Sequence, residues 1–209
     1  MELAIAWLNS RADPRGLPRD VAKLLDDVPA LSGCGVKLAV PELRTSLPGG
    51  SRASQTDLWA LLRGDQHLVS LSVEGKAREP FGEIVSEWLD VKKPDGRKAR
   101  LAFLCEQLQL TDAEVLGLRY QLLHRTVAAL IEAEGWRADA AVMLIQHFAE
   151  GGAPAGDSWQ DFSRFASQLG VTAEVGRLQQ VPRGLTVPLW IGWLESPVAT
   201  DEEIAAVAG

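Results

Sequence analysis

Three charged residues are the best candidates for chemistry in this sequence: Asp57, Glu74 and Lys76. Asp57 lies near the start of segment 55–63, and the other two lie near the end of segment 68–76. Neighbouring carboxylates repel each other unless positive charge lies between them, and a lysine or a divalent metal can supply that charge. Mg²⁺ prefers one or two carboxylates together with water and substrate phosphate. These residue types therefore fit a site for a divalent metal and a phosphate ester.

The two segments read as strands of a β-hairpin, and their apolar pattern predicts the register. A turn centred between Asp65 and Gln66 pairs apolar residues on one face: Leu58 with Val73, Ala60 with Leu71, and Leu62 with Val69. A slip of one residue would pair apolar with polar side chains. The same register puts Asp57 directly opposite Glu74 on the other face, with Cβ atoms about 4.5–5.5 Å apart. Lys76 follows two residues further along that face.

This arrangement predicts a hydrolytic centre. A metal held by Asp57 and Glu74 would polarise a phosphodiester oxygen and lower the pKa of a bound water. Lys76 would orient that water or stabilise the charge that grows on the phosphate. The alternative is a solvent-facing hairpin with an ordinary Lys–Glu pair, because Glu-x-Lys alone is a weak signal. A β-bulge near Glu74 and Gly75 would also disturb the pairing.

The elements around the hairpin predict an α/β fold, with a mixed central sheet flanked by helices. We expect helices at about 18–27, 80–90, 97–109, 112–134 and 158–169, and further strands at 36–40, 140–148 and 186–194. Thr111 and Glu114 form a capping box at the start of the fourth helix. Pro188 favours a sheet edge for the last strand, and a short helix follows in the acidic tail. The length fits a single domain, 1–209.

The pattern Asp57, hairpin, Glu74-Gly75-Lys76 resembles the PD-(D/E)XK phosphodiesterase superfamily, over about residues 55–76. Thr56 stands where that family usually has proline. The resemblance implies a restriction-endonuclease-like core, Mg²⁺ (or Mn²⁺) held by Asp57 and Glu74, Lys76 as the catalytic lysine, and DNA or RNA as substrate. The stretches ASQTD, VEGKAREPFGE and WQDFSRF also resemble a group of uncharacterised bacterial proteins.

The family often adds an acidic residue from the first helix and a polar residue from a later one. Asp20 and Asp26 are candidates for the first role, and Gln121 for the second. Gln121 and Arg125 are four residues apart on a helix, away from its apolar stripe. They face either the site or water, and we slightly favour water.

Two further groups near the hairpin have open roles. Glu79, with Glu83, either adds to a second metal site or stabilises the start of a helix. Arg52, with Arg44, flanks a Gly-Gly turn and either contacts phosphates or has no role at the site. The three histidines show no metal-ligand spacing, and packing explains His124 and His147 better.

The net charge of −7 is unevenly distributed. Residues 1–125 carry 17 basic and 17 acidic side chains, whereas residues 126–209 carry 4 and 11. Five of the nine residues in segment 92–100 are basic, so a polyanion could approach the first part of the chain. That segment is equally well explained as a solvated loop.

The cysteines and the hydropathy indicate the compartment. Cys34 and Cys105 have no paired spacing, and without an export signal they read as reduced thiols of a cytoplasmic protein. No apolar run approaches the roughly 18 residues that a membrane span needs, so we expect no membrane association.

Three functions remain open at this stage. The first is a metal-dependent nuclease. The second is a catalytically inactive nuclease-like scaffold, a protein-binding or regulatory module whose partner docks on the acidic C-terminal third. The third is a hydrolase of a small phosphorylated compound at the same residues. A homodimer is compatible with all three.

Overall fold

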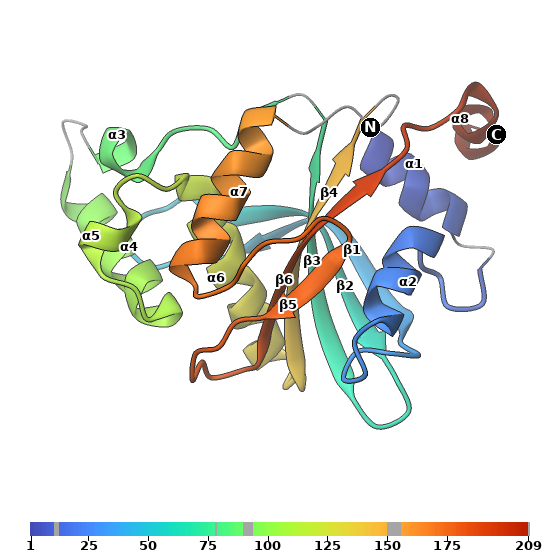
Figure 1. Ribbon diagram of the computed structural model, residues 1–209, viewed down its shortest axis with the longest axis horizontal. Helices are drawn as coiled ribbons and strands as arrows, with labels where there is room; N and C mark the ends of the chain where they lie inside the picture. The colour runs from blue at the N-terminus through green and yellow to red at the C-terminus, as the bar shows by residue number, and fades with distance from the viewer. Residues whose placement is uncertain (11–12, 78, 90–93, 150–155, 209) are drawn as a thin grey trace.

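A mixed six-stranded sheet forms the centre of the computed structural model, which describes residues 1–10, 13–77, 79–89, 94–149 and 156–208 (Figure 1). The strands are β1 (Gly35–Thr45), β2 (Ser54–Arg63), β3 (Leu68–Lys76), β4 (Ala140–Phe148), β5 (Arg177–Gln180) and β6 (Leu189–Ser196). Their order across the sheet is β1-β2-β3-β4-β6-β5. The expected mixed α/β sheet is therefore present.

Strand directions divide the sheet into two parts. β1, β2 and β3 form an antiparallel meander, whereas β3, β4 and β6 run parallel to one another. The short β5 pairs antiparallel with β6 and forms the edge. The expected edge position for the last strand is therefore wrong. Pro188 directly precedes β6, where it needs no N–H for the ladder, and its carbonyl accepts a hydrogen bond from Ala141 N.

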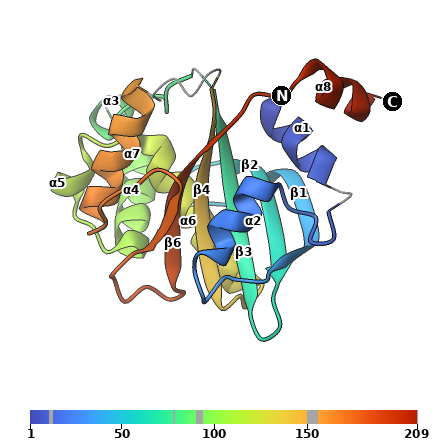
Figure 2. The ribbon, with the colours of Figure 1, turned by 45° about the vertical axis from the view of Figure 1, so that its right-hand side comes forward.

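Helices cover both faces of the sheet (Figures 1 and 2). One face carries α4 (Pro94–Leu108), α6 (Tyr120–Gly135) and α7 (Gly156–Gln168), and the other carries α1 (Glu2–Asn9) and α2 (Arg19–Asp26). The remaining helices are α3 (Val85–Leu89), α5 (Asp112–Val115) and α8 (Asp201–Ala208). Across the described residues, no helix combines the length and the apolar character that a bilayer crossing requires.

The central strand β4 shows why the sequence there is an unbroken apolar run. All nine of its residues are buried. Met143 and Ile145 pack into the core under α4, α6 and α7, whereas Val142 and Leu144 pack into the core under α1 and α2. A strand covered on both faces needs apolar residues at every position, so the predicted strand at 140–148 is confirmed.

The hairpin has the predicted apolar register. Three pairs face the α1/α2 core: Leu58 with Val73, Ala60 with Leu71, and Leu62 with Val69. On the opposite face Trp59 Nε1 donates to Ser70 Oγ at 2.8 Å. The alternation therefore fixes which face each residue of β3 presents, and β3 delivers Glu74 and Lys76 to the α6 side.

Two helical predictions need correction. The helix expected at 112–134 is divided into α5 and α6, because the chain between them forms a β-bridge from Arg119 to Ile84. The capping box of Thr111 and Glu114 is confirmed, but it begins the four-residue α5. The sequence prediction also had no helix at 2–9, where α1 covers the end of the sheet (Figure 2).

Candidate functional site

Four polar side chains meet at the carboxyl end of β3, two from the strand and two from α6. Glu74 and Lys76 are alternate residues of β3 and share a face. Gln121 and Arg125 lie one turn apart near the start of α6 and share a side of that helix. We call these four residues the Glu74 cluster.

Glu74 is the centre of this cluster, and only 2% of it is exposed. Its Oε2 accepts a hydrogen bond from Arg125 Nε at 2.7 Å, and its Oε1 accepts one from Gln121 Nε2. Lys76 Nζ lies 3.4 Å from Glu74 Oε1 and donates to Gln121 Oε1 at 3.3 Å. The preference for water at Gln121 and Arg125 is therefore wrong. A buried carboxylate needs donors, and the first two turns of α6 supply them.

The predicted pair of Asp57 with Glu74 is not among the paired residues of β2 and β3, which begin at Leu58–Val73. In a regular strand Ser54 and Leu58 would share a face, yet Ser54 contacts Arg125 of α6 while Leu58 packs in the α1/α2 core. The chain therefore turns over between them. Beside this segment, Glu42 of β1 has a positive φ of 55°.

After this turn, the Asp57 carboxylate lies at the open end of the sheet, toward α1. Its Oδ2 accepts a hydrogen bond from Gly75 N at 2.9 Å. In the described part of the chain, no hydrogen bond or ion pair joins Asp57 to Glu74 or Lys76. Asp57 and Lys76 instead line the same pocket beside α1.

Electrostatics still couple the two carboxylates. Burial raises the pKa of Glu74, the Arg125 charge opposes that shift, and the nearby Asp57 charge adds to it. Burial also raises the pKa of Asp57. The hydrogen bond from Gly75 N and the charges of Arg125 and Lys76 act in the opposite direction and lower it. Two carboxylates thus face two cations, so the local charge balances when all four are ionised.

A second layer holds Arg125 in place. Arg125 Nη1 donates to Ser54 Oγ at 3.3 Å, and Ser54 Oγ is 2.9 Å from His124 Nδ1. Burial, together with the charges of Arg125 and Arg100, lowers the pKa of His124 to about 3. His124 is therefore neutral at pH 7. The expectation of ordinary packing at His124 missed this polar contact, for which Ser54 gives no sequence signal.

The pocket beside Asp57 has a volume of about 400 Å³. Its charged lining consists of Glu2, Glu42, Asp57, Glu79 and Lys76. Glu2 comes from α1 and is the acidic residue of the first helix that lines this pocket.

Neither of the two predicted candidates for a first-helix acid, Asp20 and Asp26, reaches the Glu74 cluster. Asp26 pairs with Arg15 at 2.8 Å on the surface, and Asp20 lines a different pocket.

The other candidate residues, Glu79, Arg52 and the basic segment 92–100, lie in different parts of the structure. Glu79 lines the Asp57 pocket, and its Oε2 accepts a hydrogen bond from Ala77 N at 3.2 Å. Arg52 is exposed in the loop before β2. In the basic segment 92–100, Lys92 and Lys93 lie outside the described residues. Arg100 is buried and donates to the carbonyl oxygens of Leu47, Pro48 and Gly50, so it holds a loop.

Cys34 and Cys105 are free and buried, and burial raises the pKa of each thiol to about 11. Within the described ranges, no group of three or more His, Cys, Asp or Glu side chains is arranged to hold a metal ion.

Fold and site together define a mixed α/β protein with a buried carboxylate–cation cluster at the end of its central sheet. Residues 1–198 match the family model described as "Domain of unknown function (DUF6946)", and the chain belongs to that family. No curated protein and no solved structure matches the chain.

Proposed function

We propose that this protein is a divalent-metal-dependent phosphodiesterase of the nuclease type, acting on DNA or RNA, with Asp57, Glu74 and Lys76 at its centre. One observation carries the proposal. Glu74 and Lys76 of β3 converge with Gln121 of α6, and Lys76 also lines the pocket that contains Asp57.

The order of elements supports a restriction-endonuclease-like core. Helices α1 and α2, the meander β1-β2-β3, helix α6 and the parallel strand β4 occur in this order along the chain, with α3, α4 and α5 inserted between β3 and α6. The proposed centre lies at the carboxyl end of β3, in the part of the sheet where ligands of α/β proteins commonly bind.

The donor set fits Mg²⁺ or Mn²⁺ in kind, because Asp57 and Glu74 supply oxygen ligands. Among the described residues, no hydrogen bond reaches Asp57 Oδ1. Glu74 must release one of its donors, Gln121 or Arg125, to offer an oxygen. A bound metal would polarise the phosphodiester and acidify a water.

The chain's own residues have separate tasks in this proposal. Gln121 fixes Lys76 by accepting from Nζ while it donates to Glu74, so the ammonium is held beside the Glu74 carboxylate. Lys76 stabilises negative charge on the phosphate as it develops. Arg125, released from Glu74, adds a second positive charge, and Ser54 limits how far its guanidinium moves.

The test is cleavage of single- and double-stranded DNA and RNA in Mg²⁺, Mn²⁺ or EDTA. We expect metal-dependent cleavage that Glu74→Gln and Lys76→Ala each reduce by about 10²-fold or more, as for a lost electrostatic contact to the transition state. Glu106→Gln is the matched control, since Glu106 is exposed on α4 and has no candidate role. Circular dichroism confirms that each variant folds. Undiminished cleavage in both site variants would refute the proposal.

A specific observation favours a second candidate, a catalytically inactive scaffold. Both oxygens of Glu74 already have protein donors, and the cluster is balanced in charge. On this alternative the acidic segment 126–209 binds a protein partner or a second copy. Two results together would support it: no cleavage of any substrate, and the same response to added Mg²⁺ or Mn²⁺ in the unaltered chain and in Glu74→Gln.

The acidic residues that line the Asp57 pocket favour a small substrate over a nucleic-acid polymer. Glu2, Glu42 and Glu79 surround the pocket and repel a long polyanion. A small phosphorylated compound would carry less charge past them. Cleavage of nucleotides without cleavage of polymers would select this version of the enzyme proposal. All versions include a cytoplasmic location, with which the two free thiols agree.

A further inference from the structure

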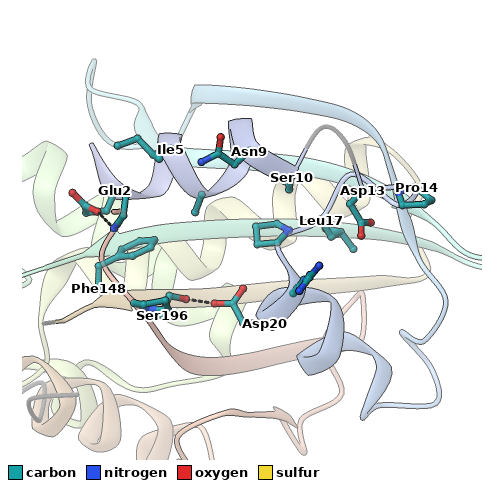
Figure 3. A pocket seen from close by; sticks show the side chains of 15 residues that line it. Glu2, Ile5, Asn9, Ser10, Asp13, Pro14, Leu17, Asp20, Phe148 and Ser196 are labelled. Atoms are coloured by element: carbon teal, nitrogen blue, oxygen red, sulfur yellow. Dashed lines mark hydrogen bonds between the residues drawn. The ribbon is translucent and has the colours of Figure 1, made fainter. Parts of the chain in front are cut away.

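A second and larger pocket lies beside α1, between that helix and α2 (Figure 3). Its volume is about 670 Å³, within the range of ligand sites in proteins. Phe148 and Ser196 place it at the carboxyl ends of the parallel strands β4 and β6. Ligands of open α/β sheets commonly bind at such ends. We call it the Asp20 pocket.

A chain of buried hydrogen bonds ends at the carboxylate of Asp20. Trp7 Nε1 donates to Gln146 Oε1 at 3.1 Å, and Gln146 Nε2 donates to Ser196 Oγ at 2.9 Å. Ser196 Oγ in turn donates to Asp20 Oδ2, as the dashed line in Figure 3 shows. Trp7, Gln146 and Ser196 are all at most 8% exposed.

The indole fixes the direction of this chain. An indole N–H can only donate, so Gln146 must accept with its oxygen and donate with its nitrogen. Ser196 then accepts from Gln146 and turns its own hydrogen toward Asp20. The order of donors thus delivers a hydrogen bond to the charged form of Asp20, which stabilises an anion at the pocket wall.

The remaining lining gives the pocket a negative, half-apolar character. Among the lining residues that the structure describes, Glu2 and Asp13 add negative charge and Arg19 adds one positive charge. Backbone N–H groups hold these acids: Ala199 N donates to Glu2 at 2.7 Å and Arg15 N to Asp13 at 2.8 Å. The apolar walls come from α1, the segment before α2, the end of β4 and the segment after β6: Ile5, Ala6, Pro14, Leu17, Pro18, Phe148, Pro197 and Ala199.

We propose that the Asp20 pocket binds a small organic cation, an ammonium group on a hydrocarbon body, with Asp20 as its counterion. An ammonium supplies N–H donors to a carboxylate that its protein contacts already hold in place, and such charge-assisted bonds are the strong ones. The hydrocarbon body buries apolar area against Ile5, Leu17 and Phe148. The net negative lining disfavours an anion. This inference does not depend on any activity at Asp57.

The test uses three probes of similar shape and different charge: 2-phenylethylamine, 2-phenylethanol and 3-phenylpropionate. Each is titrated into the full chain at pH 7 and followed by calorimetry and by chemical shifts of the indole N–H groups. We expect saturable binding of the amine, about tenfold weaker binding of the alcohol, and no binding of the carboxylate. Equal affinity for amine and alcohol would overturn the proposal.

Two variants place the binding at Asp20. Asp20→Asn should weaken the amine about tenfold and leave the alcohol unchanged, because only the charge is removed. Asp27→Asn is the matched control, since Asp27 is an exposed aspartate at the other end of α2. Equal effects of the two substitutions would contradict the assignment.

A pocket-filling variant covers the case in which Asp20→Asn disturbs the fold. Ala6→Leu adds volume from α1 and should weaken the amine and the alcohol alike. Unchanged binding of both probes to a folded Ala6→Leu chain would place the ligand elsewhere and refute the site.

Discussion

The Glu74 cluster and the Asp20 pocket place a carboxylate at the same end of the sheet and treat it in different ways. Glu74 is held by two cations and an amide, all within the protein. Asp20 is held by neutral donors, a hydroxyl and a backbone N–H. Cations neutralise a carboxylate, whereas neutral donors stabilise its charge and leave it available to a ligand.

The two carboxylates also differ in the free-energy cost of making them available to a ligand. A buried ion pair is costly to break, because the group left behind keeps its charge without water. Glu74 is therefore tied to the stability of the fold, and any chemistry there must rearrange existing contacts. Asp20 lies on a pocket wall, so a cation can approach it with no such rearrangement. The two predictions about stability below, and one about pH, test this difference.

The largest expected effect is loss of the cation beside Glu74. Arg125→Met keeps much of the side-chain volume but leaves Glu74 without its closest charge partner. We expect the free energy of unfolding to fall by about 3–5 kcal/mol, as measured in urea. Arg164→Met is the matched control, since Arg164 is exposed and its ion pair with Asp161 is long, at 3.7 Å. A loss at Arg125 no larger than at Arg164 would show that the cluster is not a structural ion pair.

An intermediate effect should come from pH, through His124 behind Arg125. Its folded-state pKa of about 3 lies below the unfolded value of 6.5, so the unfolded chain binds more protons between these pH values. Stability is therefore lost as the pH falls from 6.5, by about 1.4 kcal/mol per pH unit from this group. At pH 5 the loss is about 2 kcal/mol.

His124→Asn removes the titrating group and keeps an oxygen that can accept from Ser54. Urea unfolding at a series of pH values should show a shallower fall for this variant than for the unaltered chain. Parallel curves for the two proteins would contradict the prediction. Among its described lining residues the Asp20 pocket contains no histidine. Parallel curves would therefore mean that a buried histidine does not distinguish the Glu74 cluster from that pocket.

The sequence best predicted the features that follow from the two-residue period of side chains along a strand. Alternation of apolar residues gave the register from Leu58–Val73 to Leu62–Val69, and the continuous run gave β4. Both follow from the side-chain period of a strand and from burial. The Glu74–Lys76 end of β3 could be placed for the same reason.

What the sequence missed depends on long-range packing. The change of face between Ser54 and Leu58 has no local sequence signal, and neither has the positive φ of Glu42 on the neighbouring strand. Gln121 and Arg125 lie on the polar side of an amphipathic helix, which is normally exposed. Here the start of α6 crosses a buried carboxylate, so that side is buried. The chain from Trp7 to Ser196 joins residues far apart in sequence, and no spacing rule finds it.

The smallest expected effect is at the Asp20 pocket. Ser196→Ala removes the hydroxyl that links Gln146 to Asp20, so a buried amide N–H loses its acceptor. We expect a loss of about 1–2 kcal/mol in the free energy of unfolding, because no charge is left buried without a partner. Ser167→Ala, at an exposed serine of α7, should change stability by less than about 0.5 kcal/mol. Among the described residues the two sites share no hydrogen-bond partner, so Ser196→Ala and Arg125→Met should add in the double variant within about 0.5 kcal/mol. Coupling well beyond that value would mean that Glu74 and Asp20 belong to one hydrogen-bond network. The contrast between a carboxylate held by cations and one held by neutral donors would then be wrong.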